Sequence, residues 1–351
     1  MRSLGIVMCA ALLGACGDDG GAMPIDATSF PDEQQPPQGA CGVTLGAVPV
    51  TLAETGLCED AGCATTAAEV RLYAPQFELY SDTATKRRWI CLPPGATIDT
   101  SDMDLWKFPV GTRVWKEFTR DGVRVETRFI TKVMDDDAAM GAWLYAAYAW
   151  NGTQDAAMLV ESTGQLNANG TQHDIPSRGQ CKRCHEGLPS RVLGFGAISL
   201  DHDAPAGTLD LEDAITAGML SAPPAGIGAP RFALPGAQLD HDAMGYLHAN
   251  CGHCHNPGST THDVTPLELR LDTTKLATLQ ATPVYTTAYD VDGMVGAGAL
   301  LGKIIDPQNT DNSVMLIRFR STTSPPKMPE LGTEMPDSAA DTLLSSWIDS
   351  L

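Results

Sequence analysis

The sequence predicts an α+β multidomain protein, with an N-terminal antiparallel β-sandwich-like domain followed by a mainly helical region. Residues 64–165 contain short runs rich in β-branched and aromatic residues, separated by proline, glycine and aspartate, which is typical of an antiparallel domain. The second half of the chain contains segments with apolar residues at helical spacing. At 351 residues, the chain is long enough for about two domains with cores of their own.

The overall composition excludes several classes of protein. The formal net charge of −20 argues against nucleic acid as a partner, because duplex binding depends on Lys and Arg side chains that neutralise phosphates. Hydrophobic residues make up 43% of the chain and charged residues 19%, which is typical of a folded protein. No apolar run reaches the roughly 18 to 20 residues that cross a bilayer. The ten cysteines are the feature that needs an explanation.

The N-terminus has the pattern of an export signal. Arg2 precedes an apolar stretch over residues 4–13, and small residues follow before Cys16. The order Leu-Gly-Ala-Cys resembles the lipobox of bacterial lipoproteins, which implies cleavage before Cys16 and diacylglycerol on its sulfur. Because acyl chains contribute about 0.8 kcal/mol per buried CH₂, several chains would anchor the protein to a membrane. The alternative is an ordinary secretory signal with a coincidental cysteine.

The expected organisation of the exported chain follows from this signal. Residues 1–15, which include Cys9, are interpreted as the removed signal peptide, and residues 16–40 as a flexible acidic tether rich in Gly, Asp, Pro and Gln. Localisation is expected to be outside the cytoplasm, on a bacterial outer membrane or the periplasmic face of a membrane, where thiols oxidise. The membrane anchor would be the lipid on Cys16.

Residues 41–172 are expected to form the β-rich domain. Asp121-Gly122 between two of its apolar runs is a hairpin signal. Five of the six tryptophans fall in this part of the chain and are expected to fill its core. The predicted strands are Glu69–Tyr73, Lys86–Leu92, Thr112–Phe118, Val123–Val133 and Ala142–Trp150.

Four cysteines lie before or within these strands: Cys41, Cys58, Cys63 and Cys91. In an exported segment, four oxidisable cysteines most simply form two disulfides, for which three pairings are possible. Zinc is the alternative, and no nearby histidine supports it. The sequence therefore predicts a structural role for these four residues.

The remaining four cysteines form two C-x-x-C-H motifs, at residues 181–185 and 251–255, and this pentapeptide is the attachment signature of c-type haem. Two thiols one helical turn apart can add to the two vinyl groups of one porphyrin, and the following histidine can then bind the iron. The sequence predicts two covalently bound haem c groups. Their expected thioether and axial residues are Cys181, Cys184, His185, Cys251, Cys254 and His255.

Two other uses of the C-x-x-C pattern are disfavoured. A zinc ribbon would pair the two motifs, but 66 residues separate Cys184 from Cys251, against about 15 to 20 in such ribbons. A redox-active pair of thiols requires a thioredoxin-like βαβ context, and neither motif has one.

Residues 236–351 resemble class I cytochrome c. The segment 239–250 has apolar residues at helical spacing and runs directly into the second motif, and residues 338–351 form a second apolar stripe. In class I cytochrome c the haem-bearing first helix crosses the last helix, and a distal methionine lies on the loop before that last helix. Met328, between prolines, is expected to be this ligand in preference to Met335, which lies almost on the last helix.

The first haem, expected within residues 173–235, has no clearly predicted distal ligand. His202 lies in a polar turn, and Met219 continues an apolar stripe over residues 209–219. A ligand from the β-rich domain and an open iron site are the other possibilities. The distinction matters because a vacant sixth position separates peroxide or gas chemistry from electron transfer.

The order of motifs over about residues 70–351 resembles a family of uncharacterised secreted dihaem cytochrome c proteins from environmental bacteria. This resemblance implies haem attachment at the four motif cysteines, axial ligation by His185, His255 and Met328, and no particular substrate. Besides the two C-x-x-C-H motifs, it rests on residues 80–82, 86–89, 108–112, 125–128, 175–178 and 327–329.

The expected function is the transfer of single electrons between redox partners at the cell envelope. The acidic charge favours a basic redox protein as partner, with a rate that depends on ionic strength. Two alternatives stay open: a dihaem peroxidase with an open first haem, and a zinc-stabilised binding module without redox function. Neither the oligomeric state nor the electron donor and acceptor follow from the sequence.

Overall fold

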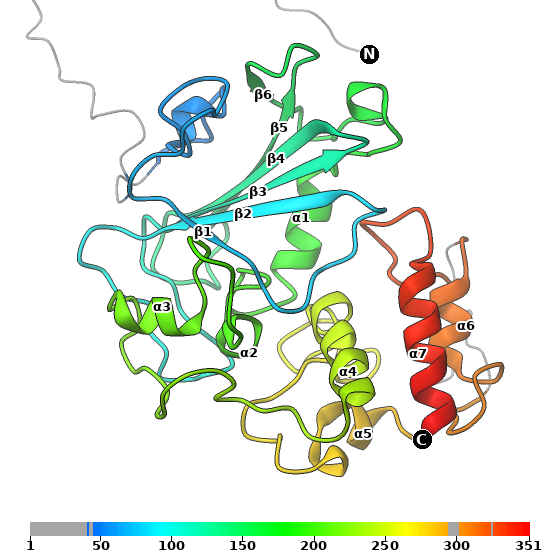
Figure 1. The fold of residues 1–351 in the computed structure, drawn as a ribbon. Coiled ribbons are helices and arrows are strands. Elements are labelled where there is room, and N and C mark those ends of the chain that lie inside the picture. Colours follow the sequence, from blue (N-terminus) through cyan, green and yellow to red (C-terminus); the bar gives the residue numbers. More distant parts are fainter. Residues whose placement is uncertain (1–40, 42–44, 294–301, 324–325) are drawn as a thin grey trace, which may run out of the picture. The chain divides into compact units, whose positions relative to one another are not determined.

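The computed structural model describes residues 41, 45–293, 302–323 and 326–351 (Figure 1). The predicted signal peptide, lipidation site Cys16 and tether lie outside the described residues. In the described part of the chain, no helix has the length and apolar character needed to cross a membrane.

Six strands form one antiparallel sheet in which each strand pairs with the next along the chain. The first five strands coincide with the five predicted runs, but β6 follows a polar loop and is too short to show an alternating pattern. The strands are β1 (Arg71–Tyr73), β2 (Thr85–Cys91), β3 (Arg113–Arg120), β4 (Val123–Lys132), β5 (Trp143–Trp150) and β6 (Ala157–Leu159).

The hairpin between β3 and β4 turns at Asp121-Gly122, as predicted. Both residues have positive φ, 52° and 79°, which is the geometry of the two-residue turn whose twist matches the flanking strands. Arg120 and Val123 are therefore directly paired at the turn, and the register then shifts between Phe118 and Thr119.

The described residues form a single sheet rather than the two facing sheets of the expected sandwich. Segments without strands cover both faces, which explains why both faces are apolar. On one face, Trp89, Trp115 and Phe129 pack against Leu52 and Leu57 of the N-terminal segment. The other face packs against segments that precede β3 and follow α1. Apolar residues of that second cluster include Ile90, Trp106, Phe108, Val114, Ile130, Trp143, Tyr145, Phe195 and Leu200.

All five tryptophans of this half are buried, with at most 4% of their surface exposed, which confirms their predicted place in the core. They are Trp89, Trp106, Trp115, Trp143 and Trp150. The structure also selects one of the three possible cysteine pairings, with disulfides Cys41–Cys91 and Cys58–Cys63. These disulfides indicate an extracytoplasmic protein.

Helices dominate the chain after the sheet, so the overall fold class is α+β. The apolar stripes predicted α4 and α7 closely. The α-helices are α1 (Arg178–His185), α2 (Ala197–Leu200), α3 (Leu211–Thr216), α4 (Gln238–Asn250), α5 (Pro283–Thr287), α6 (Val314–Arg320) and α7 (Ser338–Ser350). Short 3₁₀ helices span Ala53–Thr55, Ala168–Gly170 and Leu279–Ala281.

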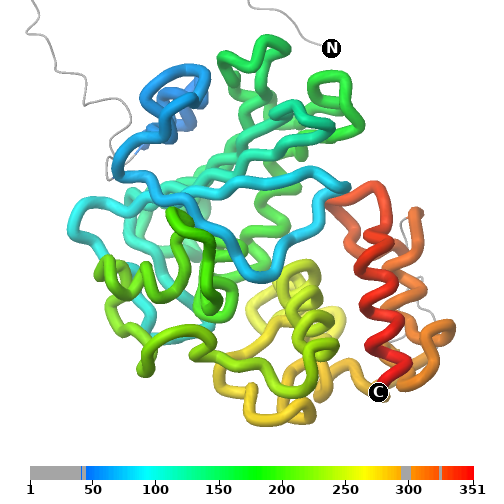
Figure 2. Tube along the Cα trace, viewed as in Figure 1, coloured from blue at the N-terminus to red at the C-terminus, as the bar shows by residue number. Residues whose placement is uncertain are grey.

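Helix α7 returns to pack against α4, which leads into the second motif (Figure 2). Their shared apolar cluster includes Leu247, Leu344 and Trp347. The Trp347 indole Nε1 donates a hydrogen bond of 3.0 Å to Asp240 Oδ1 on α4. The described residues belong to one compact unit, and the domain boundaries expected after residues 172 and 235 stay predictions.

Candidate cofactor site

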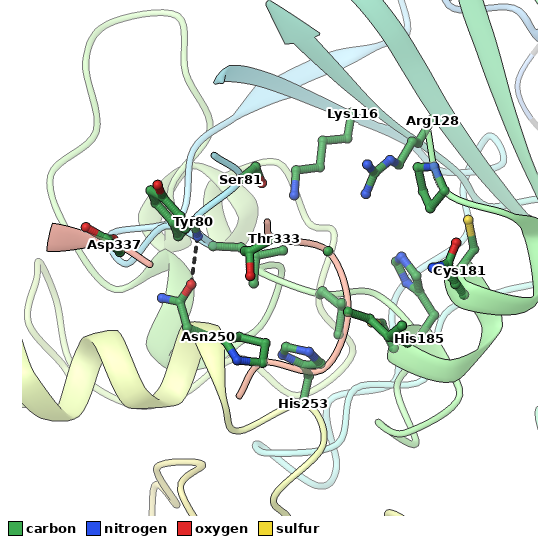
Figure 3. A pocket seen from close by; sticks show the side chains of 18 of the residues that line it. Tyr80, Ser81, Lys116, Arg128, Cys181, His185, Asn250, His253, Thr333 and Asp337 are labelled. Atoms are coloured by element: carbon green, nitrogen blue, oxygen red, sulfur yellow. Dashed lines mark hydrogen bonds between the residues drawn. The ribbon is translucent and has the colours of Figure 1, made fainter. Parts of the chain in front are cut away.

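A large cavity lies against the sheet, between β3 and β4 on one side and α1, α4 and residues 327–337 on the other (Figure 3). The space between these elements amounts to about 1250 Å³, a volume that includes the open mouth of the cavity. Cys181, Cys184 and His185 of the first motif line it together with Met328. The cavity therefore joins residues from both halves of the chain.

Helix α1 begins just before the first motif because Ser177 caps it. The Ser177 hydroxyl accepts a hydrogen bond of 3.2 Å from Gln180 N, and the Gln180 side-chain oxygen accepts one of 2.8 Å from Ser177 N. This reciprocal cap holds Cys181 and Cys184 one helical turn apart. Burial raises the pKa of both thiols, so both are neutral in these apolar surroundings.

His185 at the end of α1 is oriented by a backbone carbonyl. Its Nδ1 lies 2.6 Å from the Arg191 oxygen, so Nδ1 carries the proton and Nε2 keeps a free lone pair. The Tyr145 ring lies against the imidazole, with 5.6 Å between the ring centroids. Burial lowers the pKa of His185 to about 4, and the imidazole is therefore neutral at physiological pH, the form that binds metals.

The second motif follows α4 without interruption. Cys251 N donates to Leu247 O at 2.9 Å, and His255 N donates to Cys251 O at 2.9 Å. Burial lowers the pKa of His255 to about 4. In the described part of the chain its Nδ1 is buried without a hydrogen-bond partner, and the ring does not line the cavity. Of the two predicted proximal histidines, His185 is the better oriented.

The two motifs lie side by side although they are far apart in the sequence. The Asn256 side chain donates hydrogen bonds to Gly187 O at 3.0 Å and to His253 O at 3.0 Å. A Cβ at Gly187 would approach His253 O to 2.8 Å, so only glycine permits this contact. Arg183 of the first motif also forms an ion pair with Glu330, which follows Met328.

The predicted distal residues differ in their positions. Met328 and Met335 both line the cavity, and Met328 N donates a hydrogen bond of 3.0 Å to Arg318 O. His202 does not line it, because its ring bonds through Nε2 to Ala74 O at 2.9 Å. Met219 packs into the apolar cluster beside the sheet. The structure thus brings neither of the sequence's two candidates for the first haem to the cavity.

Several polar residues that were not predicted as site residues also face this cavity, among them Lys116, Arg128 and His253. The two middle positions of a C-x-x-C motif have no fixed role, so the sequence contains no signal that would identify His253 as a cavity residue. The two cations lie in separate predicted strands, and only the strand register shows that they are neighbours.

No family, no curated protein and no solved structure matches this chain. In the described residues, no group of three or more His, Cys, Asp or Glu side chains is arranged to hold a metal ion. A haem iron needs no such group, because the porphyrin supplies four of its ligands. The residues present fit a haem in their chemistry: two thiols and an oriented, neutral imidazole line one cavity.

Proposed function

We propose that the protein is a dihaem c-type cytochrome that carries single electrons between redox partners in the bacterial cell envelope. The observation that carries this proposal is His185, which follows Cys181 and Cys184 on α1 and presents a free Nε2 beside the cavity. A bound haem would supply an iron that cycles between Fe(III) and Fe(II), while the protein sets its potential.

The residues that would hold the two haems covalently are the four motif cysteines. His185 and His255 are the proposed proximal ligands, and Met328 is the proposed distal ligand of the second haem. The packing of α4 on α7 supports a class I cytochrome c-like arrangement of residues 236–351, because α4 leads into the second motif and α7 is the last helix.

The proposed partner is a basic redox protein, and the proposed location is a membrane to which lipid on Cys16 anchors the chain. The net charge of −20 would steer a basic partner toward the protein. Electron exchange should therefore slow as ionic strength rises, because salt screens charges beyond about 8 Å at 0.15 M.

A second candidate, a peroxidase-like enzyme with an open first haem, is favoured by one observation. Both residues that the sequence offered as distal ligands of the first haem, His202 and Met219, lie away from the cavity. An iron without a sixth protein ligand would be able to bind peroxide or a gas. This candidate requires that Met328, Met335 and His253, which line the same cavity, do not bind the first iron.

An optical spectrum separates the two functions. The full chain, matured with haem, should give two haems per chain as pyridine haemochrome, and a count below two contradicts the dihaem proposal. The reduced protein is then exposed to CO. We expect no spectral shift from an electron carrier with two six-coordinate haems, whereas a shift in one haem would support the peroxidase. A colourless protein would favour the zinc-stabilised module.

Replacement of Met328 by alanine is expected to convert one of the two haems to high spin and to lower its reduction potential, since a thioether ligand raises the potential. The measurement is the loss of the methionine–iron charge-transfer band, together with a potentiometric titration. Met335→Ala is the matched control, because Met335 also lines the cavity. If the control loses the band and Met328→Ala keeps it, Met335 is the ligand.

A further inference from the structure

Three cations lie directly opposite one another on neighbouring strands. Arg88 on β2 pairs with Lys116 on β3, and Lys116 pairs with Arg128 on β4. Like charges in directly opposed positions destabilise a sheet. The row lies on the sheet face that borders the cavity, and Lys116 and Arg128 both line it (Figure 3).

The carboxylates near this row do not balance its charge. Glu78 pairs with Arg88 at 3.1 Å and also with Lys86 at 3.4 Å, so one carboxylate serves two cations. Glu126 pairs with Arg128 at 2.6 Å. Lys116 forms no ion pair in the described part of the chain, and its Nζ lies 4.9 Å from the centroid of the Phe118 ring. Within the row, Arg88 and Arg128 each have a carboxylate partner, and Lys116 has none among the described residues.

The pKa of the Lys116 ammonium agrees with the absence of a carboxylate partner for this residue within the described ranges. Its burial, and then the positive charges of Arg88 and Arg128, lower the pKa of the Lys116 ammonium well below its usual value. A charged amine in such a position is costly unless an anion accompanies it. An anion in the cavity that Lys116 and Arg128 line would oppose both effects, because it would stabilise the charged amine and offset the neighbouring positive charges.

We propose that Lys116 and Arg128 form a binding site on the sheet for the carboxylates of a porphyrin attached in this cavity. The inference rests on the proposed function, because it requires an attached haem. Each haem carries two propionates, so a haem attached in this cavity would bring the carboxylate that Lys116 lacks. Charge-assisted hydrogen bonds from Lys and Arg to carboxylates are among the stronger contacts in proteins.

The other arginines near the second motif are already engaged. Arg320 donates from Nε to Asp341 Oδ1 at 2.8 Å and also bonds Ser345, while Arg318 donates from Nε to Pro326 O at 3.1 Å. Arg270 donates to Asp104 O at 2.6 Å. Lys327, which also lines the cavity, donates from Nζ to Thr333 O, whereas Lys116 Nζ has neither a hydrogen bond nor an ion pair in the described residues. Lys116 is therefore the cavity cation with the most to gain from a propionate, and the sheet would form one wall of the cofactor site.

Lys116→Gln tests this site in the full chain matured with haem. A cation beside a haem favours the reduced state, which carries one more negative charge, so removing the cation should lower the potential. We expect two haems per chain, up to a tenfold change in the one-electron equilibrium constant of one haem, and a shifted propionate bending mode in resonance Raman spectra. A tenfold change corresponds to 59 mV.

Two control variants accompany Lys116→Gln. One removes a positive charge elsewhere, and the other keeps the positive charge at residue 116. Lys107→Gln removes the same charge from an exposed lysine outside the row and should change neither readout. Lys116→Arg keeps the charge and should retain a near wild-type potential. If Lys116→Gln does not mature, the same readouts are taken on Lys116→Met, whose apolar side chain has similar length.

The outcomes separate this inference from the proposed function. If the wild-type chain carries no haem after maturation, the proposed function itself is wrong. A chain with two haems whose potentials and propionate modes are the same in Lys116→Gln as in the wild type overturns the carboxylate site alone. Conversion of a haem to high spin in Lys116→Gln also overturns it, since Lys116 would then be an axial ligand.

Discussion

Replacement of both Cys251 and Cys254 by serine is expected to leave one haem per chain and to halve the pyridine haemochrome absorbance. The two motifs carry separate pairs of thiols, and each pair can form thioethers to only one porphyrin. The variant with Cys181 and Cys184 replaced should lose the same amount. The readout is haem per chain, with protein quantified independently by amino-acid analysis.

The two double variants should also differ in their spectra. If Met328 ligates the second haem, the methionine–iron band persists in the Cys181/Cys184 variant and disappears in the Cys251/Cys254 variant. A double replacement of Cys58 and Cys63 is the control, because this pair forms a disulfide in the structure. It removes two cysteines and should keep two haems. An unchanged haem count in either motif variant would contradict covalent attachment at that motif.

Replacement of Trp347 by alanine is expected to lower the free energy of unfolding by about 3–5 kcal/mol, the usual cost of truncating a large buried aromatic side chain. Trp347 is fully buried between α7 and α4 and lies 6.4 Å, between ring centroids, from Tyr285. Its loss would also leave Asp240 Oδ1 without the indole hydrogen bond.

The measurement for Trp347 is guanidinium unfolding followed by far-ultraviolet circular dichroism. Asp349→Ala on the same helix is exposed and is the matched control, with an expected change within about 0.5 kcal/mol. Because α7 follows the segment that contains Met328 and Met335, the Trp347 variant should also weaken the methionine–iron band. A Trp347 variant as stable as the control would mean that the contact of α4 with α7 contributes little to the fold.

Local sequence patterns predicted most of the secondary structure. The five long runs became β1 to β5 because each alternates or concentrates apolar residues between strong turn signals such as Asp121-Gly122. Helices α4 and α7 followed from apolar residues at helical spacing. These signals are local, because they depend on neighbouring residues and not on contacts with distant parts of the chain.

Other features depended on contacts between distant segments. Strand β6 is only three residues long, and its neighbours supply the hydrogen bonds that make it a strand. The single sheet differs from the expected sandwich because the N-terminal segment covers one face, while loops and the short helices α2 and α3 cover the other. None of these segments has the alternating pattern of a strand. His202 is a polar-turn residue in the sequence, but Ala74, 128 residues earlier, determines where its ring points.

By itself, the sequence determined the chemistry expected of this protein. The spacing of two cysteines and a histidine within five residues is a local property, so both haem motifs are visible without a fold. Only the tertiary structure decided that Asn256 joins the motifs and that Arg88, Lys116 and Arg128 form one row. Strand register and long-range packing create these contacts, and neither is encoded in the spacing of residues along a single segment.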